Sequence, residues 1–421
     1  MKNLALHWKI LIGMALGVGF GLIMANFEFG KGFISDWIKP FGTIFINPLK
    51  LIAIPLILAS LIKGISDLKD ITKLSKMGGA TIAIYMITTL IAVSIGLIVV
   101  NVIKPGDSIS DETRIELINA YESDADQKRA VAEDTKNSGP LQTLIDVVPS
   151  NIVSAASDNK NMLQVIFFSI LFGIAMILIP EKKSRPIKDF FDSFNDVILK
   201  IIDLIMLFAP YGVFALLATL IVEAPKWDLL KSLLLYSLTL ILGLAILIVL
   251  YLIIVKIFTR KSPNYFLKGI LPAQLVAFST SSSAATLPVT MDRVHNHLGV
   301  KEEVSSFVLP IGATINMDGT ALYQAIAAVF IAQTFGLDLS LGAQLGIILT
   351  ATLASIGAAA VPSAGIIVLV IVLSQAGIPE AGLALIFAVD RPLDMCRTVV
   401  NITGDATVSM LVAKSVKKSE D

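Results

Sequence analysis

Five polar side chains near the end of the chain are spaced so that they share one side of an α-helix. Asp390, Asp394, Arg397, Asn401 and Asp405 follow at intervals of four, three, four and four residues, and residues three or four apart lie on one helix face. Carboxylate and amide oxygens suit hard cations such as sodium. The guanidinium fork of Arg397 favours a planar carboxylate, and Asp394 suits an ammonium group. Together they indicate an acidic amino acid as ligand.

Two earlier stretches also carry oxygen-rich side chains. NMDGTALY, from Asn316 to Tyr323, supplies an amide, a carboxylate, a hydroxyl and a glycine that can free backbone carbonyls. FSTSSSAATLP, from Phe278 to Pro288, is rich in hydroxyls. The plainer alternatives are hydroxyls that bond back to their own helix and an internal salt-bridge ladder around Arg397. One guanidinium cannot neutralise three carboxylates and Asp318 together, which favours bound cations.

The elements that position these residues are predicted to lie in a membrane. Of the 421 residues, 55% are hydrophobic and 16% are charged, against about 25% charged residues in soluble domains. The 33 basic and 33 acidic residues cancel, so no overall charge indicates nucleic acid as a partner. The single cysteine, Cys396, excludes an intramolecular disulfide. A soluble cytosolic enzyme is therefore excluded.

Six hydrophobic stretches in the first 255 residues are predicted to be membrane helices, since about 20 helical residues cross the hydrocarbon core. The first is interpreted as a retained span, because no small-residue cleavage site with a polar chain follows it. In the second, Pro48 and Pro55 predict a kinked helix beside other protein. The six stretches are Ile10 to Ala25, Phe41 to Ile62, Met77 to Ile103, Met162 to Pro180, Leu204 to Val222 and Ser232 to Val255.

The charges between these stretches predict the orientation of the chain. The segment from Gly106 to Gly139 contains nine acidic and four basic residues and is expected to be a water-side loop. Short basic connectors are predicted at Lys63 to Lys76, Glu181 to Lys200 and Lys256 to Lys268. By the positive-inside rule, the N-terminus is cytoplasmic and the acidic insert external. The expected location is the cell membrane, crossed many times.

The second half of the chain is predicted to contain two re-entrant hairpins. Leu339 to Pro379 is 41 residues without a charge, so two arms of about a dozen residues around its Gly- and Ala-rich middle are expected to enter the membrane and return. Gly269 to Met291 has two short apolar arms around the serine run. Each hairpin precedes a charged hydrophobic helix, Ser305 to Gly336 or Ala381 to Val412. This indicates an inverted repeat, a midplane binding site and eight full spans, with a cytoplasmic C-terminus.

Three strings, in this order, resemble a known family. SSSAATLP (Ser281 to Pro288), NMDGTALY and DMCRTVVNITGD (Asp394 to Asp405) are similar to the sodium-coupled glutamate/aspartate transporters, the dicarboxylate/amino acid:cation symporters. The resemblance covers essentially the whole chain. It implies an all-α polytopic membrane protein with eight transmembrane helices, two re-entrant hairpins and inverted repeats, which forms a homotrimer and works as an elevator-type transporter. Residues 1–255 would be mainly scaffold, with the third and sixth helices joining residues 265–417 in the transport core.

The resemblance also implies residue roles for the symport of aspartate and/or glutamate with several Na⁺ ions. Arg397 would bind the side-chain carboxylate of the substrate and Asp394 its amino group, while Asn401 and the backbone of Ser283 would hold the α-carboxylate. The implied substrate-binding residues are Ser282, Ser283, Thr320, Val361, Pro362, Gly365, Asp394, Arg397, Thr398 and Asn401. The implied sodium-binding residues are Tyr85, Thr88, Thr89, Gly312, Thr314, Asn316, Asp318, Ser355, Asn401 and Asp405.

Some positions refine or depart from the family pattern. Proton-coupled relatives tend to lose the carboxylates that correspond to Asp318 and Asp405, so their presence favours sodium. Gln324 replaces a glutamate that is linked to proton cotransport in the animal carriers, and an amide cannot titrate. A second arginine of the relatives is absent, because its two usual places here are Ser281 and Met395. Either Arg391 replaces it, or the site lacks that charge.

Two other functions use the same residues. An intramembrane aspartyl protease needs two facing aspartates, which Asp318 and Asp405 can supply, but it leaves Arg397 and the hairpins unexplained. An ion channel lined by the polar stripe would conduct without accumulating its substrate, so sodium-driven accumulation separates the two. No enzyme activity is expected. The three histidines have no spacing typical of a metal site; they are His7, His295 and His297.

Overall fold

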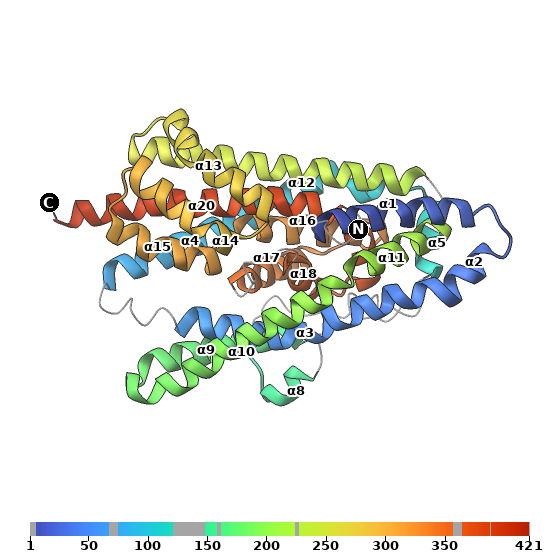
Figure 1. Ribbon diagram of the computed structural model, residues 1–421, viewed down its shortest axis with the longest axis horizontal. Helices are drawn as coiled ribbons and strands as arrows, with labels where there is room; N and C mark the ends of the chain where they lie inside the picture. Colours follow the sequence, from blue (N-terminus) through green and yellow to red (C-terminus); the bar gives the residue numbers. More distant parts are fainter. Residues whose placement is uncertain are drawn as a thin grey trace.

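The computed structural model describes residues 6–66, 75–120, 148–157, 161–223, 227–356, 364–387 and 389–420. Within these residues the chain is helical and contains no strand. Figure 1 shows an elongated bundle in which the longest helices run along the long axis and the C-terminus lies at one end. The helices form two groups by their packing.

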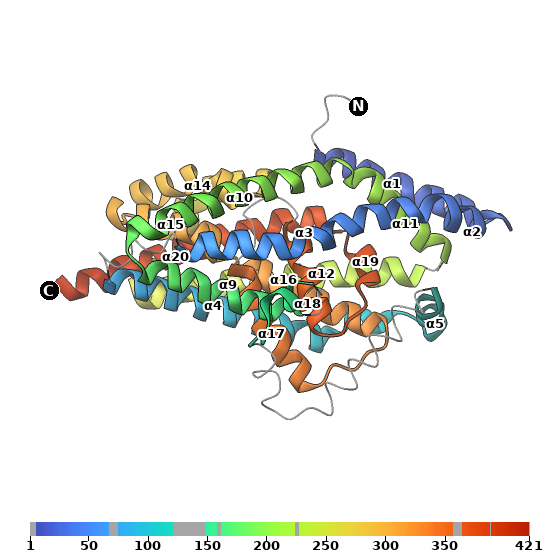
Figure 2. The ribbon, with the colours of Figure 1, turned by 90° about the horizontal axis from the view of Figure 1, so that it is seen from below.

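The first group consists of helices from the N-terminal half. α1 (Leu6–Met24) packs on α11 (Ala209–Glu223), and α3 (Lys39–Ser66) packs on α9 (Met162–Leu178), α10 (Glu181–Leu207) and α11. Figure 2 shows α3 alongside α10 and α11. α3 continues as one helix through both of its prolines.

Glycines set the close approach of α1 to α11. A Cβ at Gly17 would lie 2.5 Å from the backbone oxygen of Phe214, and one at Gly13 would overlap the backbone oxygen of Pro210. Small residues at intervals of four let two helix backbones come together where lipid provides no hydrophobic driving force. The spacing of these glycines therefore explains why α1 lies directly against α11.

The basic connector predicted from Glu181 to Lys200 is wrong, because these residues form most of α10. Ile198, Ile202 and Ile205 recur at helical spacing and are buried, on a helix that packs against α3. The charged residues lie elsewhere on the helix, so averaging hydropathy along the chain concealed an amphipathic helix. A bend of 53° separates α10 from α11. The span predicted from Leu204 to Val222 therefore starts in the last residues of α10 and continues into α11.

Two other predicted loops are partly helical. The connector from Lys256 to Lys268 contains the π-helix Val255–Thr259 and the start of α13, Pro263–Thr280. The acidic insert begins with the 3-10 helix Pro105–Ser108 and α5, Asp111–Ala120, and its remainder lies outside the described residues. The connector from Lys63 to Lys76 also lies partly outside them.

The second group surrounds α16 (Asp318–Thr334). α4 (Ser75–Ile103), α12 (Trp227–Ile254) and α20 (Asp390–Glu420) all pack against α16. Every residue of α16 except Gln333 is buried. A helix covered on all sides shows no amphipathic stripe, and polar residues within it must find partners inside the protein.

Two pairs of short helices pack against this centre. α13 and α14 (Ser283–Asp292) contact each other, and α17 (Leu341–Ile356) contacts α18 (Ala364–Gln375). Ser281 turns the first pair with a φ of +51°, and the Ser282 hydroxyl accepts a hydrogen bond from the Ala285 amide at 3.1 Å. The turn between α17 and α18 lies outside the described residues. Whether the two pairs enter a membrane and return stays a prediction.

The described helices include several that are long and apolar enough to cross a membrane. Four meet this condition, or five if the bent pair α10 and α11 is one span. The chain is thus a polytopic membrane protein by length and composition, and the predicted total of eight spans stays a prediction. The remaining elements are α2 (Gly30–Phe33), Ile34–Ile38, α8 (Ile152–Ala156), Arg293–His297, α15 (Glu302–Ile315), Glu380–Gly382 and α19 (Leu383–Phe387).

Candidate functional site

The site is built around a break between two consecutive helices. α15 ends at Ile315 and α16 begins at Asp318, and Asn316 and Met317 between them have non-helical backbone angles. Helix ends leave backbone groups without intrahelical partners. Asn316 is 1% exposed and Asp318 is 0% exposed, so this break lies inside the protein.

Hydrogen bonds with two other helices, α20 and α4, converge on the break. The Asn316 amide nitrogen donates to Asp405 Oδ1 on α20 at 2.9 Å. From α4, Thr89 donates its hydroxyl to Asp318 Oδ1 at 2.6 Å, and Thr88 donates to Asn316 Oδ1 at 3.4 Å. These four residues were predicted as sodium ligands together with Asp405, and the structure brings all five together.

Tyr85 and Gly312 lie next to these five residues. The Tyr85 hydroxyl donates to the Val308 carbonyl at 3.0 Å. A Cβ at Gly312 would overlap the Tyr85 hydroxyl and lie 2.5 Å from Asp405 Oδ1. Only glycine leaves room there for the phenol and the carboxylate. We call the whole group the carboxylate cluster: Tyr85, Thr88, Thr89, Tyr251, Gly312, Asn316, Asp318 and Asp405.

The carboxylate cluster has the chemistry of an alkali-cation site. Within the described residues, neither Asp318 nor Asp405 forms an ion pair, although Asp405 is only 2% exposed. Buried carboxylates are costly unless they are paired or coordinate a cation. The described part of the chain contains no group of three His, Cys, Asp or Glu side chains placed to hold a metal. A cation here would therefore use amide, hydroxyl and backbone oxygens besides the carboxylates, as hard cations do.

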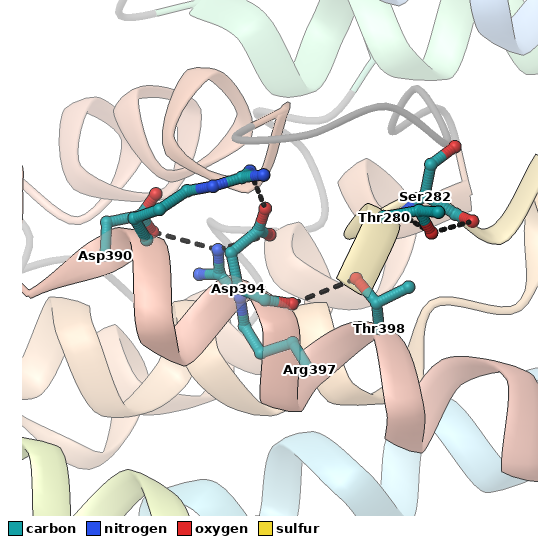
Figure 3. Close-up of polar contacts among 7 residues, drawn as sticks. Thr280, Ser282, Asp390, Asp394, Arg397 and Thr398 are labelled. Atoms are coloured by element: carbon teal, nitrogen blue, oxygen red, sulfur yellow. Dashed lines mark hydrogen bonds and ion pairs between the residues drawn. The ribbon is translucent and has the colours of Figure 1, made fainter. Parts of the chain in front are cut away.

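Arg397 lies on α20 at the centre of a second group. Its Nη2 donates to Asp394 Oδ1 at 2.7 Å and to Asp390 Oδ1 at 2.9 Å, as Figure 3 shows. Its guanidinium lies 3.7 Å from the centre of the Tyr323 ring, and the side chain is fully buried. Arg391 Nη1 lies 3.4 Å from Asp394 Oδ2. We call Tyr323, Asp390, Arg391, Asp394 and Arg397 the arginine cluster.

The salt-bridge ladder expected as an alternative, in which Arg397 pairs Asp394 or Asp390, is present, since Arg397 pairs both carboxylates. It does not use the whole guanidinium. Within the described residues, Nε and Nη1 of Arg397 are buried and have no hydrogen-bond partner. A buried guanidinium with unused donors is suited to a planar anion.

Asn401 lies on α20 between Arg397 and Asp405 and bonds to the first turn of α16. Its Oδ1 accepts a hydrogen bond from the Gly319 amide at 2.8 Å, and its Nδ2 donates to Thr320 Oγ1 at 3.3 Å. The Thr398 hydroxyl donates back to the Asp394 carbonyl at 2.9 Å. The polar stripe on α20 thus faces the first turn of α16, as the predicted roles of Thr320 and Asn401 require.

Only some of the predicted hairpin residues of the site lie within the described part of the chain. Figure 3 shows Thr280 and Ser282 beside the Thr398 end of the cluster, and α14, which Ser283 begins, packs against α20. A Cβ on Gly365, at the start of α18, would lie 3.4 Å from Arg397 Nη1. Val361 and Pro362, predicted to bind the substrate, lie outside the described residues.

Two predicted sodium ligands bond within their own helices. The exposed Thr314 donates its hydroxyl to the Ile311 carbonyl at 3.0 Å. The buried Ser355 donates to the Thr352 carbonyl at 2.9 Å. Neither hydroxyl bonds to a described residue of the carboxylate cluster, and their predicted role as sodium ligands stays a prediction.

Sequence reasoning missed two tyrosines of the site. Tyr251, on α12, donates its hydroxyl to Asp318 Oδ2 at 2.5 Å, and Tyr323 supports the guanidinium of Arg397. A single tyrosine in a long apolar span has no spacing that marks it. Tyr323 stood inside NMDGTALY, and its position three residues after Thr320, almost one helical turn, was the available signal.

Comparison with known proteins gives one consistent result. The sequence profile of the sodium:dicarboxylate symporter family matches residues 6–415. The chain is 39% identical over 459 residues to excitatory amino acid transporter 3 of Homo sapiens, covering 99% of this chain and 87% of that protein.

Bacterial relatives give the same picture. A proton/sodium-glutamate symport protein of Bacillus caldotenax is 33% identical over 416 residues, 98% of this chain and 95% of that protein. A proton/glutamate-aspartate symporter of Escherichia coli (strain K12) is 34% identical over 423 residues, 98% and 94% of the two chains. The chain therefore belongs to the sodium:dicarboxylate symporter family, whose members are transporters and not enzymes.

Proposed function

We propose that this chain is a secondary transporter that carries aspartate or glutamate across the cell membrane together with sodium. The observation that supports this most is that a buried guanidinium on α20 and two buried carboxylates, one on α16 and one on α20, lie in the same region with unused capacity to bind charge. Arg397 has unused donors for an anion, while Asp318 and Asp405 have no cationic partner in the described part of the chain. A carrier that moves a dicarboxylate together with cations needs a site for an anion and a site for cations.

The substrate is proposed to bind at the arginine cluster. Its side-chain carboxylate would meet Nε and Nη1 of Arg397, since Nη2 already bonds to Asp390 and Asp394. Its ammonium group would meet Asp394. Its α-carboxylate would lie toward Asn401 and the turn at Ser282 and Ser283. The remaining proposed contacts are Thr320, Val361, Pro362, Gly365 and Thr398.

Sodium rather than protons is proposed as the coupled ion, although the Bacillus caldotenax relative is named for both ions and the Escherichia coli relative for protons alone. Both oxygens of Asp318 accept hydroxyl hydrogen bonds, which suits an ionised carboxylate because it is an acceptor only. The Gln324 amide cannot carry a proton into the cycle. The carboxylate cluster is proposed to bind sodium, with Asn401, Thr314 and Ser355 as further ligands.

The packing supports a division into two parts for movement. α4, α12 and α20 pack on α16 and α15 packs on α20, whereas α3 packs on α9, α10 and α11 and α1 packs on α11. α3 and α9 meet the first group at α17 and α18. We propose an elevator in which the first group, with both hairpins, moves against the second. The second group would form a homotrimer, using apolar residues such as Phe41, Ile44 and Phe208 that are exposed on the single chain. Both termini are proposed to be cytoplasmic.

Uptake into proteoliposomes tests the proposal. Labelled L-aspartate is offered under an inward sodium gradient, with potassium or a proton gradient in its place as controls, and with glutamate, asparagine and serine as competitors. Sodium-driven accumulation that glutamate blocks and serine does not is the expected result. Accumulation driven by protons alone would refute sodium coupling. Flux that never exceeds equilibrium would indicate a pore.

A further inference from the structure

The hydroxyl of Tyr251 is the one group that α12 contributes to the hydrogen bonds of the carboxylate cluster, within the described residues. It donates to Asp318 Oδ2 at 2.5 Å, and the side chain is 0% exposed. The same hydroxyl lies against α20, since a Cβ at Gly404 would be 2.9 Å from Tyr251 Oη and 3.1 Å from Asn316 Nδ2. Tyr251 therefore lies where α12, α16 and α20 meet.

The two carboxylate oxygens of Asp318 accept hydrogen bonds from two different helices. Thr89 on α4 bonds to Oδ1, and Tyr251 on α12 bonds to Oδ2. Two donors on two different helices fix both the position and the rotation of the carboxylate plane. A site whose ligands are held in place before the ion arrives binds more tightly, because less ordering is left for the binding step.

We propose that Tyr251 is a positioning residue for the sodium site at Asp318. Its hydroxyl holds the carboxylate of Asp318 in the orientation that receives the ion. This inference rests on the proposed function, since it assumes that Asp318 binds sodium. It does not make Tyr251 a ligand: the tyrosine acts through Asp318.

The expected effect follows from the behaviour of outer partners at other metal sites. Loss of such a partner typically costs about 10- to 100-fold in metal affinity. Tyr251→Phe removes one oxygen and leaves the ring in place. The sodium concentration at half-saturation should therefore rise about 10- to 100-fold. At saturating sodium, aspartate affinity and maximal uptake rate should approach those of the unmodified protein, because the arginine cluster is unchanged.

The chain offers a matched control on the same helix. Tyr236 is also on α12 and 0% exposed. The centre of its ring lies 4.6 Å from the centre of the Phe330 ring. Its hydroxyl has no hydrogen-bond partner within the described residues. Tyr236→Phe removes the same atom from a comparable environment, so its sodium midpoint should stay unchanged.

The test is a sodium titration of the purified full chain in detergent without amino acid, followed by thermal unfolding, since a bound ion raises the unfolding temperature. A higher sodium midpoint for Tyr251→Phe than for Tyr236→Phe supports the inference. Equal midpoints, or tighter sodium binding by Tyr251→Phe, would overturn it. If the unmodified protein shows no sodium dependence at all, the proposed function fails instead.

A second variant covers the case in which Tyr251→Phe does not fold. Incorporating 3-fluorotyrosine at position 251 keeps the ring and the hydroxyl but makes the hydroxyl a stronger donor. A sodium midpoint that differs from that of the unmodified protein supports the role of this hydrogen bond. A midpoint that does not change contradicts it.

Discussion

Arg397 should recognise the side-chain carboxylate of the substrate, and a comparison of two ligands isolates this contact. Asparagine has the shape of aspartate but replaces the carboxylate by an amide. The perturbation is Arg397→Ala, measured with both ligands, so that effects of the substitution common to both cancel in the ratio. The second variant, Arg397→Ala with Asp390→Asn, also removes one of the carboxylates that would otherwise lose its partner.

The size of the effect follows from the unused donors of the guanidinium. Nε and Nη1 have no partner in the described residues, so a carboxylate can accept two hydrogen bonds without breaking those from Nη2. Each hydrogen bond to a charged group contributes about 1.5–3 kcal/mol, and the two together about 3–6 kcal/mol. The preference for aspartate over asparagine should therefore be about 10²- to 10⁴-fold, and it should fall close to one without Arg397.

Calorimetric binding in saturating sodium measures this ratio directly. The control is thermal unfolding of each variant in sodium, which establishes that the protein is folded before its ligands are compared. A hundredfold preference for aspartate that survives in Arg397→Ala would refute the reasoning. It would assign the carboxylate to another cation, for which Arg391 is the nearest candidate in the described structure.

Three further outcomes follow from the geometry. Gly312→Ala should raise the half-saturating sodium concentration about tenfold or more, because its Cβ would lie 2.5 Å from Asp405 Oδ1. The control is Gly346→Ala, where no atom lies within 4 Å of the added Cβ. Equal sodium curves for the two variants would contradict the prediction. Arg391→Gln should change aspartate affinity less than about tenfold, since its ion pair is longer than those of Arg397; complete loss of binding in calorimetry would show otherwise. Asp405→Asn keeps the shape but removes a buried charge, so sodium-dependent thermal stabilisation should weaken, and an unchanged sodium titration would count against a cation there.

Much of the site was accessible from the sequence because its residues are close together along the chain. The stripe on α20 is a matter of helical spacing, and Asn316 and Asp318 lie in one short string. Their joint placement with Thr88 and Thr89 came from the family resemblance, not from spacing, because these residues are more than 220 positions apart. The bond from Tyr251 to Asp318 was missed because nothing local distinguishes a tyrosine that donates to a carboxylate from one that only packs.

The errors in the fold have a common physical origin. Composition predicts a connector from Glu181 to Lys200 because it averages the charges of α10 with the buried apolar face of the same helix. α13 and the π-helix Val255–Thr259 extend into the predicted basic connector, because charged residues can occupy helix ends where water is near. Hydropathy locates apolar spans well, but it does not find where a partly charged helix begins.

The break between α15 and α16 also has an electrostatic consequence. Peptide dipoles place about half a positive charge at a helix N-terminus and about half a negative charge at a C-terminus. At Asn316 and Met317, the C-terminus of α15 meets the N-terminus of α16, so one short segment offers a negative pole and a positive pole side by side. Asp318 in the first turn of α16 already places a carboxylate at the positive pole, so the pole left unmatched in this segment is the negative one, at the end of α15. The folded backbone itself thus favours a cation beside Asn316, in addition to the side chains around it.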